Sequence, residues 1–92
     1  MEKYKFNEIE YELIEEYKEG FEYEEVLNKV TDYFIPYDYI VGDWSYGKLR
    51  LKGFCNKTNE IYKPINDIDN LKSYLELNCP FNCKYFVLKR ID

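Results

Sequence analysis

The stretch that decides the fold is Tyr37-Asp38-Tyr39-Ile40-Val41-Gly42-Asp43-Trp44-Ser45-Tyr46-Gly47-Lys48-Leu49-Arg50-Leu51-Lys52-Gly53-Phe54. In it, an apolar strand, an aromatic turn and a basic strand follow one another without a break. Strict alternation over residues 48–52 places two leucines on one face of the second strand and Lys48, Arg50 and Lys52 on the other. Such a strand lines a core on one side and carries a charged surface on the other.

The residues before this stretch predict a hairpin and a helix. Apolar and polar residues alternate on both sides of Asn7-Glu8, a pattern typical of two strands joined by a turn. Residues 22–34 carry apolar side chains at helical spacing, at Tyr23, Val26, Leu27, Val30 and Phe34. We therefore expect a helix over residues 22–34 that ends before Pro36.

The second half of the chain, from residue 39 onward, predicts three strands, a helix and a final strand. Residues 39–43 and 48–55 are expected to form the first two strands, and residues 60–62 pair back as a third. Asp67 can cap a helix that Pro80 ends. The strand over residues 84–90 has the apolar centre Tyr-Phe-Val-Leu, so we expect cover on both of its faces.

These elements predict an α+β fold. The simplest architecture is a mixed, largely antiparallel sheet with its two helices packed on one side. A layered sandwich, with two layers of strands and one of helices, is the alternative. The chain has 92 residues and no internal repeat or linker, so residues 1–92 are expected to form a single domain.

Composition and motifs argue against several classes of protein. The longest apolar run, residues 85–88, is far shorter than the roughly 18 residues of a membrane helix, and the N-terminus lacks a secretion signal, so we expect a cytoplasmic protein. The sequence has no His, which excludes Ser-His and Cys-His nucleophiles. Asp38 and Asp43 are badly spaced for an acid/base pair on one strand, and Asp43 is better explained as a turn residue. We expect no enzyme and no cofactor.

Charge is distributed unevenly along the chain. The net charge is −5, but residues 1–38 carry 12 acids and 4 bases, whereas residues 39–92 carry 6 acids and 9 bases. The bases of the second half include the row Lys48, Arg50 and Lys52, with Trp44 and Tyr46 at its entrance. We expect these five residues to form the binding surface of a non-catalytic interaction module.

Two kinds of partner fit this expected surface. Aromatic and cationic side chains recognise RNA through stacking and phosphate contacts, and they are also frequent hot spots for an acidic protein. An RNA-associated partner is our preferred hypothesis, although the overall acidity argues against tight nonspecific binding to nucleic acid. In the structural alternative, Trp44 belongs to the core and the cations only solvate an exposed sheet face.

The cysteines suggest a different function. Cys79 and Cys83 lie four residues apart across Pro80, and Cys55 is distant in sequence. Three cysteines without His do not complete a four-ligand zinc site, and a lone thiol usually behaves as a small buried apolar group. The alternative function is a thiol-dependent redox or metal-binding protein that uses Cys79 and Cys83.

Two blocks of the sequence resemble the YutD-like family of small bacterial proteins. They are residues 39–54 and the segment Asn-Cys-Pro-Phe-Asn-Cys-Lys-Tyr-Phe-Val-Leu-Lys-Arg at residues 78–90, and Tyr-Glu-Leu-Ile-Glu at residues 11–15 is similar to the family's opening strand. The resemblance implies a compact α+β domain from low-GC Gram-positive bacteria and supplies no catalytic residue or cofactor. Cys55 departs from the pattern, because the family is expected to have an aromatic or other apolar residue there.

Overall fold

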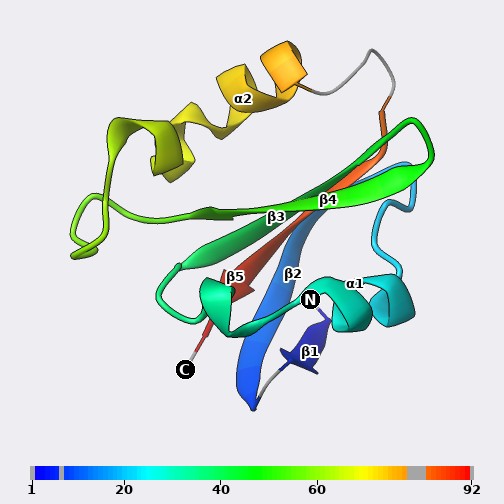
Figure 1. Ribbon diagram of the computed structural model, residues 1–92, viewed down its shortest axis with the longest axis horizontal. Coiled ribbons are helices and arrows are strands. Elements are labelled where there is room, and N and C mark those ends of the chain that lie inside the picture. The colour runs from blue at the N-terminus through cyan, green and yellow to red at the C-terminus, as the bar shows by residue number, and fades with distance from the viewer. Residues whose placement is uncertain (1, 7, 79–82, 92) are drawn as a thin grey trace.

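Five strands form one sheet in the order β1-β2-β5-β3-β4 (Figure 1). The computed structural model describes residues 2–6, 8–78 and 83–91. The strands are β1 (Lys3–Phe6), β2 (Ile9–Tyr17), β3 (Tyr39–Ser45), β4 (Lys48–Phe54) and β5 (Tyr85–Arg90). All four pairs of neighbouring strands are antiparallel, so the α+β class is confirmed, and the expectation of a mixed sheet is replaced by an antiparallel one.

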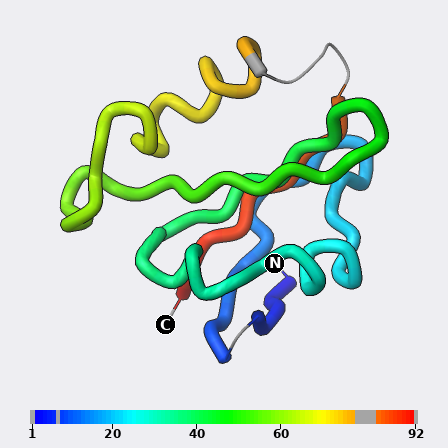
Figure 2. The backbone as a smooth tube through the Cα atoms, viewed as in Figure 1, coloured from blue at the N-terminus to red at the C-terminus, as the bar shows by residue number. Residues whose placement is uncertain are grey.

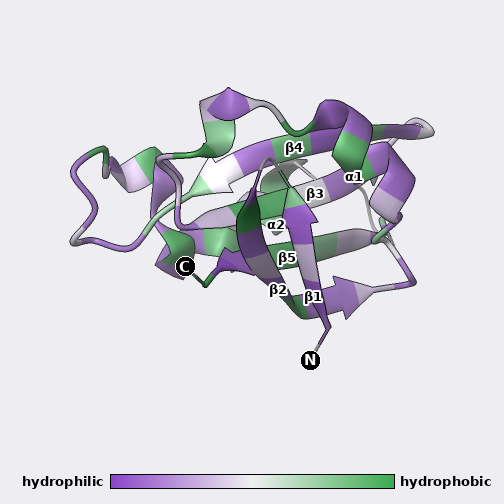
Figure 3. Ribbon diagram, turned by 90° about the horizontal axis from the view of Figure 1, so that it is seen from below, coloured by the Kyte–Doolittle hydropathy of each residue, from purple (hydrophilic) through white to green (hydrophobic). Residues whose placement is uncertain are grey.

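The helices α1 (Tyr23–Lys29) and α2 (Leu71–Asn78) lie on opposite faces of this sheet (Figures 1 and 3). Consecutive residues of β3 show why: Ile40 packs in the same cluster as Val26 of α1, and Val41 packs with Leu71 of α2. The expectation that both helices pack on one side is therefore wrong. The expectation that β5 is covered on both faces is confirmed, because Phe86, Val87 and Leu88 are all buried.

The first helix is shorter than its apolar spacing predicts. It ends at Lys29 because Val30 has an extended backbone, with φ −70° and ψ 128°. Thr31 then caps a 3₁₀ turn over Asp32–Phe34, with its side-chain oxygen accepting a hydrogen bond from the amide of Tyr33. Val30 and Phe34 still reach the same core cluster, so two short elements satisfy a pattern that one long helix would also satisfy.

The segment between β4 and α2 is a loop with two 3₁₀ turns, so the predicted strand over residues 60–62 is absent. An isolated parallel bridge joins Cys55 to Asp67, with Cys55 N donating to Asn66 O at 2.9 Å. Asp67 caps the 3₁₀ turn Ile68–Asn70 rather than α2 itself, which begins at Leu71. This bridge brings the loop back beside the end of β4 (Figure 2).

The backbone of Gly42 in β3 lies directly against the ring of Phe86 in β5, so a substitution of Gly42 tests this close packing. A Cβ atom at Gly42 would lie 2.1 Å from the ring of Phe86, whereas one at Gly47 would have no neighbour within 4 Å. We expect Gly42→Ala to lower the free energy of unfolding by about 3 kcal/mol, through overpacking. Urea denaturation measures this loss. Gly47→Ala is the control and should cost only about 1 kcal/mol, for its positive φ. Equal losses would contradict the close packing.

The carboxylate of Asp67 makes the stability of the fold depend on pH in the acidic range. Its carboxylate accepts hydrogen bonds from Asp69 N and from Tyr62 Oη, both at 2.9 Å, and mainly the Asp69 amide lowers the pKa of Asp67 below 3.8. A carboxyl group with a lowered pKa in the folded state stabilises the fold above its unfolded pKa, and this contribution is lost as the pH falls through the folded value.

The loss of stability in Asp67→Asn should therefore be larger at about pH 6 than at about pH 2.5. Urea denaturation at the two pH values measures it. Asp69→Asn is the control, because the side chain of Asp69 is 73% exposed, and it should change the free energy of unfolding by less than about 0.5 kcal/mol. A loss in Asp67→Asn that does not depend on pH would contradict the role of the carboxylate.

Candidate interaction surface of the β3–β4 hairpin

The turn between β3 and β4 has two residues, Tyr46 and Gly47. Ser45 pairs with Lys48, and the φ angles of 53° at Tyr46 and 76° at Gly47 are those of a type I′ turn. This turn is shorter than the aromatic turn predicted over residues 44–47, because β3 continues to Ser45. The hairpin tip therefore presents one large side chain, Tyr46, which is 97% exposed.

Tyr46 is an unexpected residue at this position. The first residue of a type I′ turn is usually Asn, Asp or Gly, because a left-handed backbone costs other residues about 1 kcal/mol or more. The ring of Tyr46 is exposed to water, so burial of its apolar surface does not offset this cost. Residues in unfavourable backbone conformations cluster at functional sites, so Tyr46 is a candidate functional residue.

The predicted row of cations lies on the face of the sheet that α2 covers. Lys48 is exposed, but the guanidinium of Arg50 places Nε and Nη2 each 2.8 Å from Oδ1 of Asp43. The ammonium of Lys52 lies 5.5 Å from the ring centroids of both Phe54 and Tyr74. Two of the three cations are therefore engaged within the fold, and Lys48 is the member of the row that projects beside the tip.

Asp43 lies within β3 and points toward α2, so its expected role as a turn residue is wrong. Its side chain is 1% exposed. Besides the Arg50 pair, it accepts a hydrogen bond from the hydroxyl of Tyr74 on α2, at 3.3 Å. Burial and the nearby Asp43 raise the pKa of Tyr74, so this hydroxyl keeps its proton at neutral pH. Arg50 faces Asp43 across the two-residue turn, but Tyr74 lies 31 residues further along the chain, and no sequence pattern indicates that its hydroxyl meets this carboxylate.

Trp44 lies on the opposite face from the cations. It packs against the core cluster on the α1 side, and its Nε1 donates to the carbonyl of Gly20 at 2.7 Å. The ammonium of Lys84 lies 4.6 Å from the Trp44 ring centroid and 3.9 Å from a carboxylate oxygen of Glu22. The five predicted binding residues thus do not share one surface, and the structure brings only Tyr46, Lys48 and Arg50 together at one end of the hairpin.

Of the three cysteines, the structure describes Cys55 and Cys83. Cys55 is buried, and burial raises the pKa of its thiol, as expected for a small apolar residue without a reactive role. The predicted pair of Cys79 and Cys83 cannot be placed, because Cys79 lies outside the described residues. Within the described residues, no group of three His, Cys, Asp or Glu side chains is arranged to hold a metal ion.

The described helices are all too short and too polar to cross a membrane.

A model of the family described as "Putative antitoxin YutD-like" matches residues 5–89, nearly the whole chain. The chain belongs to the YutD-like family. The resemblance recognised in residues 39–54 and 78–90 is thereby confirmed.

A curated relative and a solved structure agree with this membership. "Putative antitoxin YutD" of Bacillus subtilis (strain 168) is 46% identical over 82 residues, which are 89% of this chain and 90% of that protein. The solution NMR structure of protein yutD from B. subtilis matches with a TM-score of 0.82 and 42% identity, over 99% of this chain and 83% of that one. This YutD-like chain therefore shares both sequence and fold with the B. subtilis protein.

The contact between Asp43 and Arg50 makes a prediction about stability. Arg50→Ala would leave a nearly buried carboxylate without its cation, although water reaches the half-exposed site. We therefore expect the free energy of unfolding to fall by about 2 to 3 kcal/mol. Urea denaturation measures the loss. Lys48→Ala, the matched control in the same row, should change it by less than about 0.5 kcal/mol. If the two variants are equally stable, Arg50 does not hold Asp43 in place.

Proposed function

We propose that this protein is a cytoplasmic antitoxin, a non-catalytic module that binds a protein toxin through the tip of the β3–β4 hairpin. The description of its family and of its B. subtilis relative supports the antitoxin role. The conformation of Tyr46 supports the place of binding. The partner surface is expected to combine a pocket for the Tyr46 ring with acidic groups that face Lys48.

The observation that carries this proposal is the exposed aromatic ring on a rigid turn. Tyr46 is 97% exposed at the end of a hairpin whose strands pair over their whole length, from Tyr39 with Phe54 to Ser45 with Lys48. This pairing fixes the backbone that carries the ring, so only side-chain rotation is lost when Tyr46 enters a pocket, and Tyr is among the commonest hot-spot residues of protein interfaces. Lys48 adds a charge next to this anchor.

A protein partner fits the hairpin better than RNA. Binding to a phosphate backbone needs several exposed cations, yet Arg50 is paired with Asp43 and Lys52 rests against two aromatic rings. Trp44, the other residue predicted to stack on bases, lies on the opposite face and contacts Gly20. The chain as a whole has a net charge of −5. A protein that places a few acidic groups opposite Lys48 meets less repulsion from this charge than a continuous chain of phosphates does, so we favour a protein partner over an RNA-associated one.

Tyr46→Asn separates binding from folding. Asn is favoured at the first position of a type I′ turn, so this variant should raise the free energy of unfolding by up to about 1 kcal/mol. The same change should weaken toxin binding about tenfold or more, because it removes the aromatic anchor. The toxin is first identified by photo-crosslinking from position 46 in a host cell. Urea denaturation then measures the change in stability, and calorimetric titration with the toxin measures the change in affinity.

Growth of the host cell provides the functional readout. Expression of the crosslinked partner alone should arrest growth, co-expression of the wild-type chain should restore it, and Tyr46→Asn should fail to do so. Leu77→Ala is the matched control, because Leu77 is 84% exposed and belongs to α2 rather than to the hairpin. The proposal is wrong if the partner does not affect growth, or if Leu77→Ala and Tyr46→Asn weaken binding equally.

A further inference from the structure

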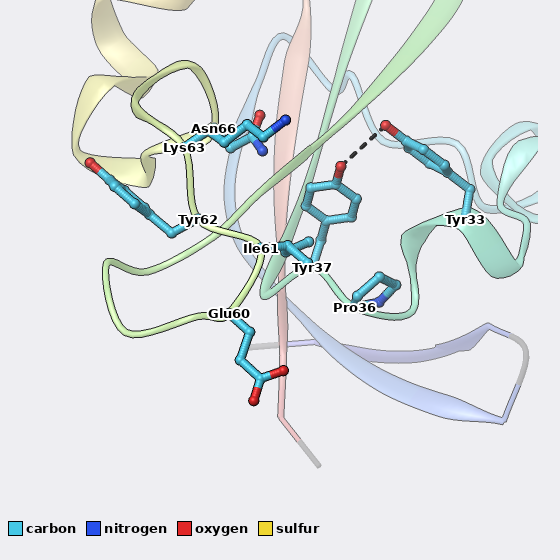
Figure 4. A pocket seen from close by; sticks show the side chains of 8 residues that line it. All are labelled: Tyr33, Pro36, Tyr37, Glu60, Ile61, Tyr62, Lys63 and Asn66. Carbon is cyan, nitrogen blue, oxygen red and sulfur yellow. Dashed lines mark hydrogen bonds between the residues drawn. The ribbon is translucent and has the colours of Figure 1, made fainter.

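A hollow of about 410 Å³ lies at the far end of the β3–β4 hairpin from Tyr46 (Figure 4). It is formed by the segment that precedes β3 and by the loop that follows β4. Three tyrosines, one proline and one isoleucine supply most of its apolar lining, and polar groups complete it: the lining residues are Tyr33, Pro36, Tyr37, Glu60, Ile61, Tyr62, Lys63 and Asn66. None of the residues predicted from the sequence to bind a partner belongs to it.

The walls of this hollow are fixed by hydrogen bonds between the two segments. The side-chain amide of Asn59 donates to Pro36 O at 2.9 Å and to an oxygen of Asp38 at 3.1 Å. The same oxygen of Asp38 accepts from Asn56 N at 2.9 Å, and the oxygen of the Asn59 side chain accepts from Ile61 N at 2.9 Å. The hollow is thus shaped without a ligand, and a ligand would bind without having to order these loops.

Tyr33 and Tyr37 form a pair of rings that leaves part of its aromatic surface open at the hollow. Tyr33 is 64% exposed, and its ring centroid lies 5.5 Å from that of Tyr37. The two hydroxyls are 3.2 Å apart, and this hydrogen bond is the main cause that raises the pKa of Tyr37 to about 12. Tyr37 therefore keeps its proton at neutral pH. One hydroxyl donates in the bond between the two rings, so the pair retains the proton of the other hydroxyl to donate to a ligand.

We propose that this hollow binds an extended, proline-containing segment of a partner protein in the polyproline II conformation. Such segments dock on aromatic surfaces and lose little conformational entropy on binding. Their carbonyl groups make no internal hydrogen bonds, so they need donors, which the remaining hydroxyl proton of the Tyr33–Tyr37 pair and the side-chain amide of Asn66 supply. The lining offers flat aromatic faces, which suit prolyl rings.

The charged side chains at the two ends of the hollow indicate which residues should flank the prolines of the bound segment. Figure 4 shows Glu60 at one end and Lys63 with Asn66 at the other, with Pro36, Tyr37 and Ile61 between them. A complementary segment carries a basic residue on one side of its prolines and an acidic residue on the other. This site is independent of the proposed antitoxin role, because it lies at the opposite end of the hairpin from Tyr46, along the longest dimension of 32 Å.

Titration of the ¹⁵N-labelled full chain with the peptide Ac-Lys-Pro-Pro-Pro-Pro-Pro-Asp-NH₂ tests the proposal. Saturable shifts are expected for the backbone amides of residues 33–37 and 60–66, other than the prolines at 36 and 64, which have no amide proton. Tyr33→Ala should weaken binding about tenfold, because it removes the most exposed ring. Glu60→Lys should weaken it about threefold, as expected for an exposed charge pair. Spectra of the free variants show whether each remains folded.

Three controls decide the outcome. Tyr46→Ala removes an exposed tyrosine at the other end of the hairpin and should leave the peptide affinity within about twofold, since rings remote from the site contribute little. A peptide with alanines in place of the prolines should bind much more weakly. The proposal is overturned if both peptides bind equally, if Tyr46→Ala acts like Tyr33→Ala, or if adenosine monophosphate shifts these amides and the proline peptide does not.

Discussion

The buried carboxylate of Asp43 connects the parts of the molecule on which the candidate surfaces depend. Arg50 reaches it from the neighbouring strand and Tyr74 reaches it from α2, so one side chain ties both strands of the hairpin to the helix above them. An unpaired carboxylate in this position would cost several kcal/mol, so the three groups must stay together. This requirement keeps α2 over the hairpin and holds the half-exposed guanidinium of Arg50 against Asp43. What the hairpin presents outward is therefore its tip, with Tyr46 and Lys48.

Much of the local structure could be predicted from the sequence. Alternation along residues 48–52 correctly predicted a strand with Leu49 turned toward a core, and Leu49 is 4% exposed. The first hairpin, both helices and the final strand were also found, because each has a short-range pattern. The C-terminal end of α1 was not found, because the spacing of Val30 and Phe34 fits one helix as well as a helix followed by a 3₁₀ turn. Only the backbone at Val30 distinguishes these two solutions.

The candidate surface was predicted less well, and one residue explains why. The face on which Trp44 lies depends on the length of the turn. A two-residue turn pairs Trp44 with Leu49, so the indole shares the face of the leucines rather than that of the cations. The placement of both helices on one side failed for a similar reason. Ile40 and Val41 are both apolar, and adjacent strand residues point in opposite directions, so this pair already required cover on two faces.

The setting of Cys55 makes this thiol an internal reporter. It is 0% exposed at the point where β4 meets the Asp67 loop, and burial raises the pKa of the thiol, so little reactive thiolate forms in the closed state. An alkylating reagent meets the sulfur only when that junction separates. The rate of its modification therefore measures how often the loop detaches from the end of β4. In this way a native side chain makes a local opening motion measurable without an engineered probe residue.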